Sequence, residues 1–136
     1  MYEHFLGTWA LEPESCQYEQ GDPPRSGLYR IEAHDGRLHF SITWEDAAGA
    51  SHAVSFSGTP DGEPEPFDGG DLADALVIRA VSERELVSSA LYRGVERMVA
   101  QRQLDDSRTA MRVVQVVRLP DGTSPANVAI YVKQPT

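Results

Sequence analysis

The sequence has few of the residues that hold disulfides, zinc or nucleic acid. Cys16 is the only cysteine, so no disulfide can form within the chain and the multi-cysteine zinc motifs are excluded. Lys133 is the only lysine, and 12 basic residues face 21 acidic ones, which gives a formal charge of −9. Because sequence-independent nucleic-acid binding needs a basic face, we expect no nucleic-acid partner.

Long apolar runs and long helical periods are also missing. No run approaches the roughly 18 apolar residues of a membrane span, and the start at Met1–His4 does not resemble a signal peptide. We therefore expect a cytoplasmic protein without a membrane span. At 136 residues the chain has the length of one ordinary domain, so we expect a single domain over residues 1–136. The best helical candidate is a single turn at Gly70–Ala75.

What the sequence does contain is a series of short runs that predict strands. Twelve valines against ten leucines favour β-structure, and 20 prolines and glycines separate the runs. Nine runs have strand-like alternation or valine content: Phe5–Leu11, Gly27–His34, Arg37–Glu45, His52–Gly58, Ala75–Val81, Glu85–Tyr92, Val95–Leu104, Thr109–Leu119 and Ala126–Lys133. A meander of this length usually closes into a barrel or stacks as a sandwich.

One hairpin can be assigned an inner and an outer face. Asp35 and Gly36 lie between two alternating runs and predict a two-residue turn, in which Ala33 faces Leu38. One face of this hairpin is then aromatic and aliphatic, and the other is charged, as in a half-buried sheet. The predicted inward residues are Tyr29, Ile31, Leu38, Phe40, Ile42 and Trp44.

The same alternation can be carried through the later turns, although a slip of one residue inverts every assignment after it. The middle strands then contribute His52, Val54, Phe56, Leu76, Ile78, Ala80, Leu86, Ser88 and Ala90. The last three strands contribute Val95, Arg97, Val99, Gln101, Arg112, Val114, Val116, Val128, Ile130 and Val132. Large residues opposite small ones indicate either interdigitated packing or a lumen that a ligand fills.

Gly7, Thr8 and Trp9 open the first predicted strand. This start resembles that of lipocalins and fatty-acid-binding proteins, and the chain resembles bacterial lipocalin-like proteins of the calycin superfamily. The resemblance continues through residues 7–15, 35–38, 57–58, 105–111 and 129–133 and covers nearly the whole chain. It implies an all-β fold, a single antiparallel up-and-down β-barrel of about 8–10 strands with at most one short helical turn. It also implies a lumen for a small apolar or amphipathic molecule.

Two features depart from the fatty-acid-binding proteins. Their helical lid would fall at Glu12–Ser26, which here is short and holds three prolines. Their Arg-X-Tyr pair on the last strand corresponds to Ala129 and Tyr131, so the arginine that grips a carboxylate is missing. The resemblance places Tyr131 inside the barrel, in conflict with the alternation above, and we follow the resemblance. A ligand carboxylate would then need Arg97 or Arg112, or Arg102 if the strand slips by one residue.

The candidate residues fall into two groups. The candidates for ligand binding are Tyr29, Phe40, Ile42, Trp44, Phe56, Ile78, Arg97, Gln101, Arg112 and Tyr131. The structural candidates are Gly7, Trp9 and Arg118, with the Arg118 guanidinium stacked on the Trp9 ring as in lipocalins. Only His52 of the four histidines has inward alternation, and no nucleophile–base pattern is present. We expect no catalytic residue, no metal and no cofactor.

Three functions remain open. The first is non-enzymatic binding of a small hydrophobic or amphipathic ligand in the lumen. The second is a homodimeric interaction protein whose lumen is filled by its own side chains. The third is a barrel isomerase or cyclase acting on a lipid-like substrate. Titration with an apolar probe separates the binder and the enzyme from the protein with a filled lumen.

Overall fold

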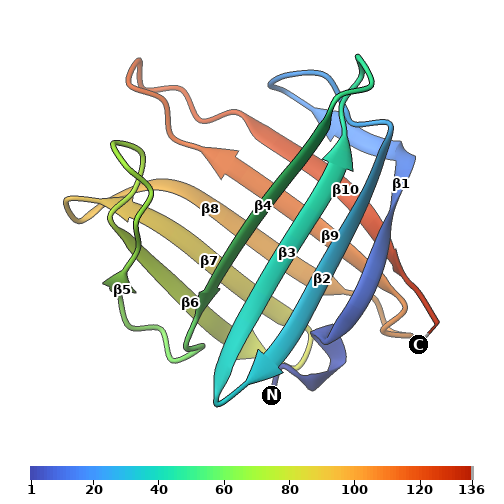
Figure 1. Ribbon diagram of the computed structural model, residues 1–136, viewed down its shortest axis with the longest axis horizontal. Helices are drawn as coiled ribbons and strands as arrows, with labels where there is room; N and C mark the ends of the chain where they lie inside the picture. The colour runs from blue at the N-terminus through green and yellow to red at the C-terminus, as the bar shows by residue number, and fades with distance from the viewer. Residues whose placement is uncertain (136) are drawn as a thin grey trace.

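The computed structural model describes residues 1–135, which form one 3-10 turn, η1 (Glu3–Phe5), and ten antiparallel strands. The strands are β1 (Gly7–Tyr18), β2 (Ser26–His34), β3 (Arg37–Glu45), β4 (Ser51–Gly58), β5 (Glu65–Pro66), β6 (Ala75–Ser82), β7 (Glu85–Tyr92), β8 (Val95–Leu104), β9 (Ala110–Val117) and β10 (Ala126–Lys133). Their order in the sheet is β4-β3-β2-β1-β10-β9-β8-β7-β6-β5. The sheet curls so that β2–β4 cross in front of β7–β9, which makes a nearly closed barrel (Figure 1).

The first hairpin has the predicted register. Ala33 lies opposite Leu38 and Ile31 opposite Phe40, and the pairing continues to Gly27 and Trp44. Asp35 and Gly36 have φ values of 55° and 76°, the left-handed pair that a two-residue turn requires. The strand β4 extends the same face, because Phe56 lies opposite Phe40.

The alternation predicted for the last three strands is wrong, and a single β-bulge is the reason. Ala90 lies opposite Met98 but Leu91 lies opposite Glu96, so Arg97 is an extra residue in β8. One extra residue moves every later side chain to the other face of the sheet. The inward residues of these strands are therefore Met98, Ala100, Arg102, Leu104, Met111, Val113, Gln115, Asn127, Ala129 and Tyr131.

Other differences from the predicted elements are local. Gly70–Ala75 forms a turn and the start of β6, not a helix, whereas the one helical turn is η1. The strand β1 runs on past Leu11 to Tyr18, because an irregularity between Glu12 and Gln17 absorbs Pro13 without breaking the pairing to β10. No helix in residues 1–135 has the length and apolar character to cross a membrane.

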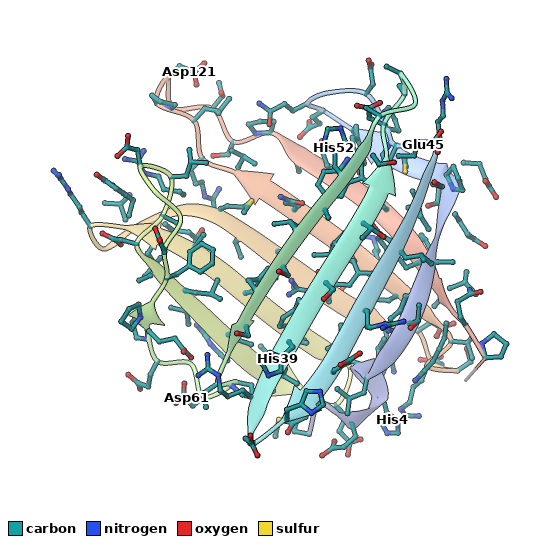
Figure 2. All side chains as sticks on the ribbon, viewed as in Figure 1. His4, His39, Glu45, His52, Asp61 and Asp121 are labelled. Atoms are coloured by element: carbon teal, nitrogen blue, oxygen red, sulfur yellow. The ribbon has the colours of Figure 1, made fainter. Side chains whose placement is uncertain are left out.

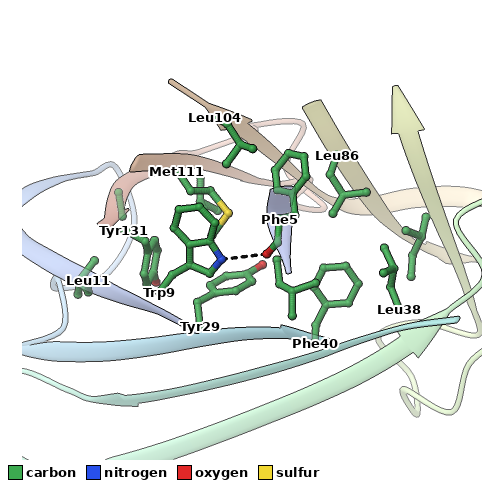
Figure 3. Packing of buried hydrophobic residues seen from close by; sticks show 14 of the residues in the cluster. Phe5, Trp9, Leu11, Tyr29, Leu38, Phe40, Leu86, Leu104, Met111 and Tyr131 are labelled. Carbon is green, nitrogen blue, oxygen red and sulfur yellow. Dashed lines mark hydrogen bonds between the residues drawn. The ribbon is translucent and has the colours of Figure 1, made fainter. Parts of the chain in front are cut away.

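The main core lies at the barrel end that η1 covers. Figure 3 shows Phe5 and Trp9 packed among Tyr29, Phe40 and Met111. Phe5 and Trp9 are 0% exposed, and the indole N–H donates a hydrogen bond of 2.9 Å to the Phe5 carbonyl. The turn η1 and β1 together therefore plug this end of the barrel.

The barrel wall has one seam, between β4 and β6, where no ladder of hydrogen bonds connects the strands. The loop after Gly58 fastens one end of the seam. There Glu65 accepts hydrogen bonds from the Thr59 backbone N–H (2.7 Å) and from Arg37 (2.9 Å), and Gly62 N–H donates to the Ile78 carbonyl (2.9 Å). Gly58 permits this close approach, because a Cβ there would lie 2.8 Å from the Ile78 side chain.

Candidate functional site: a cavity above Arg102

A cavity of about 470 Å³ occupies the half of the barrel away from η1. Its size lies in the range of small-molecule sites. Residues of nine strands and four residues outside the strands line it: Tyr18, Asp22, Pro24, Tyr29, Ile42, Trp44, Asp46, Val54, Phe56, Phe67, Leu76, Ser88, Ala90, Met98, Ala100, Arg102, Val113, Gln115, Asn127, Ala129 and Tyr131.

Strands β3 and β7 contribute large buried side chains to the packed half and small or partly exposed ones to the cavity. Along β3, Leu38 and Phe40 are fully buried, whereas Ile42 and Trp44 line the cavity. Along β7, Leu86 is buried and Ala90 lines the cavity. The lumen is thus packed at one end and open at the other, where the side chains that line it leave a cavity.

Arg102 lies at the floor of the cavity and is 1% exposed. Its Nε donates to the Tyr29 hydroxyl (2.7 Å) and its Nη2 to Ser88 Oγ (2.9 Å), while Nη1 reaches the Ala100 carbonyl at 3.4 Å. The guanidinium carbon also lies 4.7 Å from the centre of the Phe40 ring. Within residues 1–135 no carboxylate forms an ion pair with Arg102, so neutral groups alone surround this buried cation.

Tyr131 adds a second polar group to the cavity wall. Its ring meets the Tyr29 ring edge to face, with 5.2 Å between centroids. Burial, followed by the neighbouring Tyr29, raises the pKa of the Tyr131 phenol well above its ordinary value. The group is therefore a neutral hydroxyl at physiological pH, able to donate a hydrogen bond. In the described part of the chain its hydroxyl has no hydrogen-bond partner.

Aromatic pairs cover the inner face of β3 and β4. Phe40 stacks on Phe56 with 4.6 Å between centroids, and Trp44 stacks on His52 at 5.3 Å. His52 also contacts the Asp46 carboxylate at 2.7 Å, and this contact lowers the Asp46 pKa. Trp44 and Asp46 thus belong to the cavity mouth, which lies at the end of the barrel where Figure 2 labels His52 and Glu45.

Most of the residues predicted on the early strands lie at this cavity. Tyr29, Ile42, Trp44, Phe56 and Tyr131 line it. Phe40 and Ile78 point inward but are 0% and 1% exposed, so they support the floor and do not face the open space. Whether these residues touch a ligand stays a prediction.

The polar residues predicted inside the barrel lie outside it, because the bulge at Arg97 reverses the alternation. Arg97 is exposed and lies over the Tyr92 ring at 5.7 Å. Gln101 donates to Glu85 at 2.8 Å, and Arg112 is exposed on β9. Arg102, considered only as the outcome of a slip, is the arginine that the structure buries at the cavity.

The partner of Trp9 also differs from the prediction. Arg118 is exposed and pairs with Glu96 at 3.1 Å, so it does not stack on Trp9. The cation over the indole is the ammonium of Lys133, 5.3 Å from the ring centre. Gly7, at φ 128°, leaves room for this side chain, since a Cβ there would lie 3.3 Å from Lys133 Cε.

One signal in the sequence favours the observed arrangement. The predicted alternation turns two arginines of these strands inward, Arg97 and Arg112, whereas the opposite alternation turns one arginine inward, Arg102. Removing a charge from water costs free energy, so the alternation with one buried arginine has the lower desolvation cost. The resemblance also placed Tyr131 inside the barrel, which agrees with the opposite alternation and not with the predicted one.

The histidines do not form a metal site. His39 lies at the end of the barrel opposite to His52 (Figure 2). Among residues 1–135 no three His, Cys, Asp or Glu side chains come close enough to hold a metal ion.

Among known proteins, this chain resembles several solved structures in its fold. The sequence matches no family model and no curated protein. A Schistosoma mansoni fatty acid binding protein in complex with arachidonic acid superposes with a TM-score of 0.60, at 13% identity over 97% of each chain. A zebrafish ileal bile acid-binding protein complexed with cholic acid gives a TM-score of 0.56, at 11% identity over 96% of this chain and 99% of the other.

A third similar structure, the siderocalin Ex-FABP, has a TM-score of 0.53 and 10% identity, over 96% of this chain and 74% of its own. The chain therefore has the calycin fold, the antiparallel barrel of fatty-acid-binding proteins and lipocalins, as its motifs predicted. At these identities the similarity concerns the fold, and the ligand has to be inferred from the cavity itself.

Proposed function

We propose that this protein is a non-enzymatic binder of a small amphipathic molecule, held in the cavity with an anionic group, such as a carboxylate, at Arg102. The observation that carries the proposal is the buried guanidinium at the cavity floor without an anionic partner in the described chain. A buried charge is costly unless it is paired, and a ligand anion would supply the missing charge.

The groups around Arg102 are suited to such an anion. The oxygens of Tyr29 and Ser88 accept hydrogen bonds from Arg102, so their own O–H groups are free to donate. The Tyr131 hydroxyl lies on the same cavity and adds another donor. The apolar walls above would contact the rest of the ligand, as in most small-molecule sites.

The proposal is tested by comparing an acid with its alcohol. Decanoic acid and decanol are titrated against a neutral fluorescent probe in the parent protein, Arg102→Met and Arg112→Met. A charge-assisted hydrogen bond in an apolar site is worth about 1.5–3 kcal/mol, so the parent should prefer the acid by about 10- to 100-fold.

Arg102→Met should abolish this preference, whereas Arg112→Met, which changes an exposed arginine, should keep it. A parent protein that binds acid and alcohol equally, or neither, would disprove anion binding at Arg102. The cavity itself supports a binder over a barrel with a filled lumen. The cytoplasmic location and the homodimer stay predictions from the sequence.

A further inference from the structure

The aromatic residues of the chain gather on the cavity. Six of the eleven line it: Tyr18, Tyr29, Trp44, Phe56, Phe67 and Tyr131. Trp44 and Phe56 come from β3 and β4, and each is stacked on one side against a cross-strand ring. With Ile42 and Val54 of the same strands they line the cavity between the floor at Arg102 and the mouth at Asp46.

The wall across from these rings carries several small side chains among larger ones such as Met98 and Tyr131. Ser88 and Ala90 on β7, Ala100 on β8 and Ala129 on β10 line the cavity there. These strands cross behind β3 and β4 in Figure 1. These small side chains hardly project into the lumen, so they leave open space across from Trp44 and Phe56.

We infer that the ligand class of this cavity is a planar aromatic carboxylate, which rests on the proposed function and narrows it. The carboxylate lies at Arg102, and the ring system lies against Trp44 and Phe56. A flat ring gains stacking and edge-to-face contacts with these side chains beyond the area it buries, and a saturated ring of equal size gains only the area. A single cation at the floor suits a monoanion with one acidic group.

The test uses two acids with the same carbon skeleton. Isothermal titration calorimetry compares 2-naphthoate with decahydro-2-naphthoate, which carries the same carboxylate on saturated rings. Aromatic contacts with two side chains should make the parent bind 2-naphthoate about fivefold to tenfold more tightly. The same titrations are made with Trp44→Leu, Phe56→Leu and, as the control, Ile42→Leu, which alters the lining without removing a ring.

Trp44→Leu and Phe56→Leu should each reduce the preference for 2-naphthoate, while Ile42→Leu should keep it. Circular dichroism confirms that each variant is folded. Equal affinity of the parent for the two acids, with both lost in Arg102→Met, would overturn the aromatic ligand class and leave the proposed function standing. Failure of both acids to bind, or binding that does not need Arg102, would overturn both proposals.

Discussion

At the scale of single residues, two buried groups have opposite roles. Arg102 is surrounded by hydroxyls, a carbonyl and rings, so its desolvation is only partly offset within the chain. Trp9 is fully buried with its N–H satisfied and its ring covered by the Lys133 ammonium. The proposed function gives Arg102 a role in ligand recognition, whereas the burial of Trp9 gives it a role in stability.

Trp9→Ala should lower the free energy of unfolding by about 3–5 kcal/mol, because it leaves a large cavity in the packed half of the barrel. Urea unfolding of the parent and the variant measures the difference. Leu28→Ala is the control, since Leu28 is 48% exposed on the outer face and should cost far less. A Trp9→Ala protein with the unfolding midpoint of its parent would show that the indole does not hold the barrel end.

At the scale of elements, one bulge decides which side chains face the cavity. Without the bulge, the register of Leu91 opposite Glu96 would continue, with Ala90 opposite Arg97 and Ser88 opposite Val99. With it, Ser88 lies opposite Ala100, and Arg102 comes to the floor where Ser88 and Tyr29 can bind it. The bulge thus places Arg102 inside the barrel and sets which side chains of β9 and β10 face inward.

The seam between β4 and β6 depends on the ionised Glu65 carboxylate. The Thr59 backbone N–H, and then Arg37, lower the pKa of this group below its ordinary value of 4.5. A lowered folded-state pKa stabilises the fold above pH 4.5, and this stabilisation is lost as the pH falls through the folded pKa. Glu65→Gln should therefore reduce stability by about 1 kcal/mol at pH 7 and by less at pH 3.

Urea unfolding of the parent and Glu65→Gln at pH 7, 4 and 3 measures this difference. The comparison isolates Glu65, since Asp46, Asp105 and Asp121, whose pKa values are also lowered, are present in both proteins. A difference in stability that stays constant from pH 7 to pH 3 would contradict the role given to the carboxylate.

At the scale of the whole molecule, one barrel combines a packed half and an open half. The packed half, with Phe5, Trp9 and Leu38 fully buried, holds the strands together. The open half keeps about 470 Å³ unfilled because small residues stand where large ones would complete the core. Filling the interior would therefore increase stability but would remove the space that a ligand needs.

Ala100→Leu should change stability and affinity in opposite directions, because the larger leucine side chain projects into the cavity. We expect stability to rise by about 0.5–2 kcal/mol through cavity filling, and affinity for carboxylate ligands to fall at least tenfold. Thermal unfolding and calorimetric titration measure the two effects. Val99→Leu, which adds the same kind of bulk on the other face of β8, should leave affinity unchanged, and an equal loss in both variants would contradict the cavity assignment.

The sequence by itself determined nine of the ten strands of residues 1–135, the first hairpin and the packed face of β2 and β3, because these depend on local alternation and on the turn at Asp35 and Gly36. It also determined that Trp9 is buried and that Tyr131 points inward, through the resemblance of its motifs. Only the tertiary structure decided that Arg102, and not Arg97 or Arg112, lies at the cavity. A bulge is chosen by how two strands fit across the whole barrel, and that energy is not encoded in the alternation of one strand.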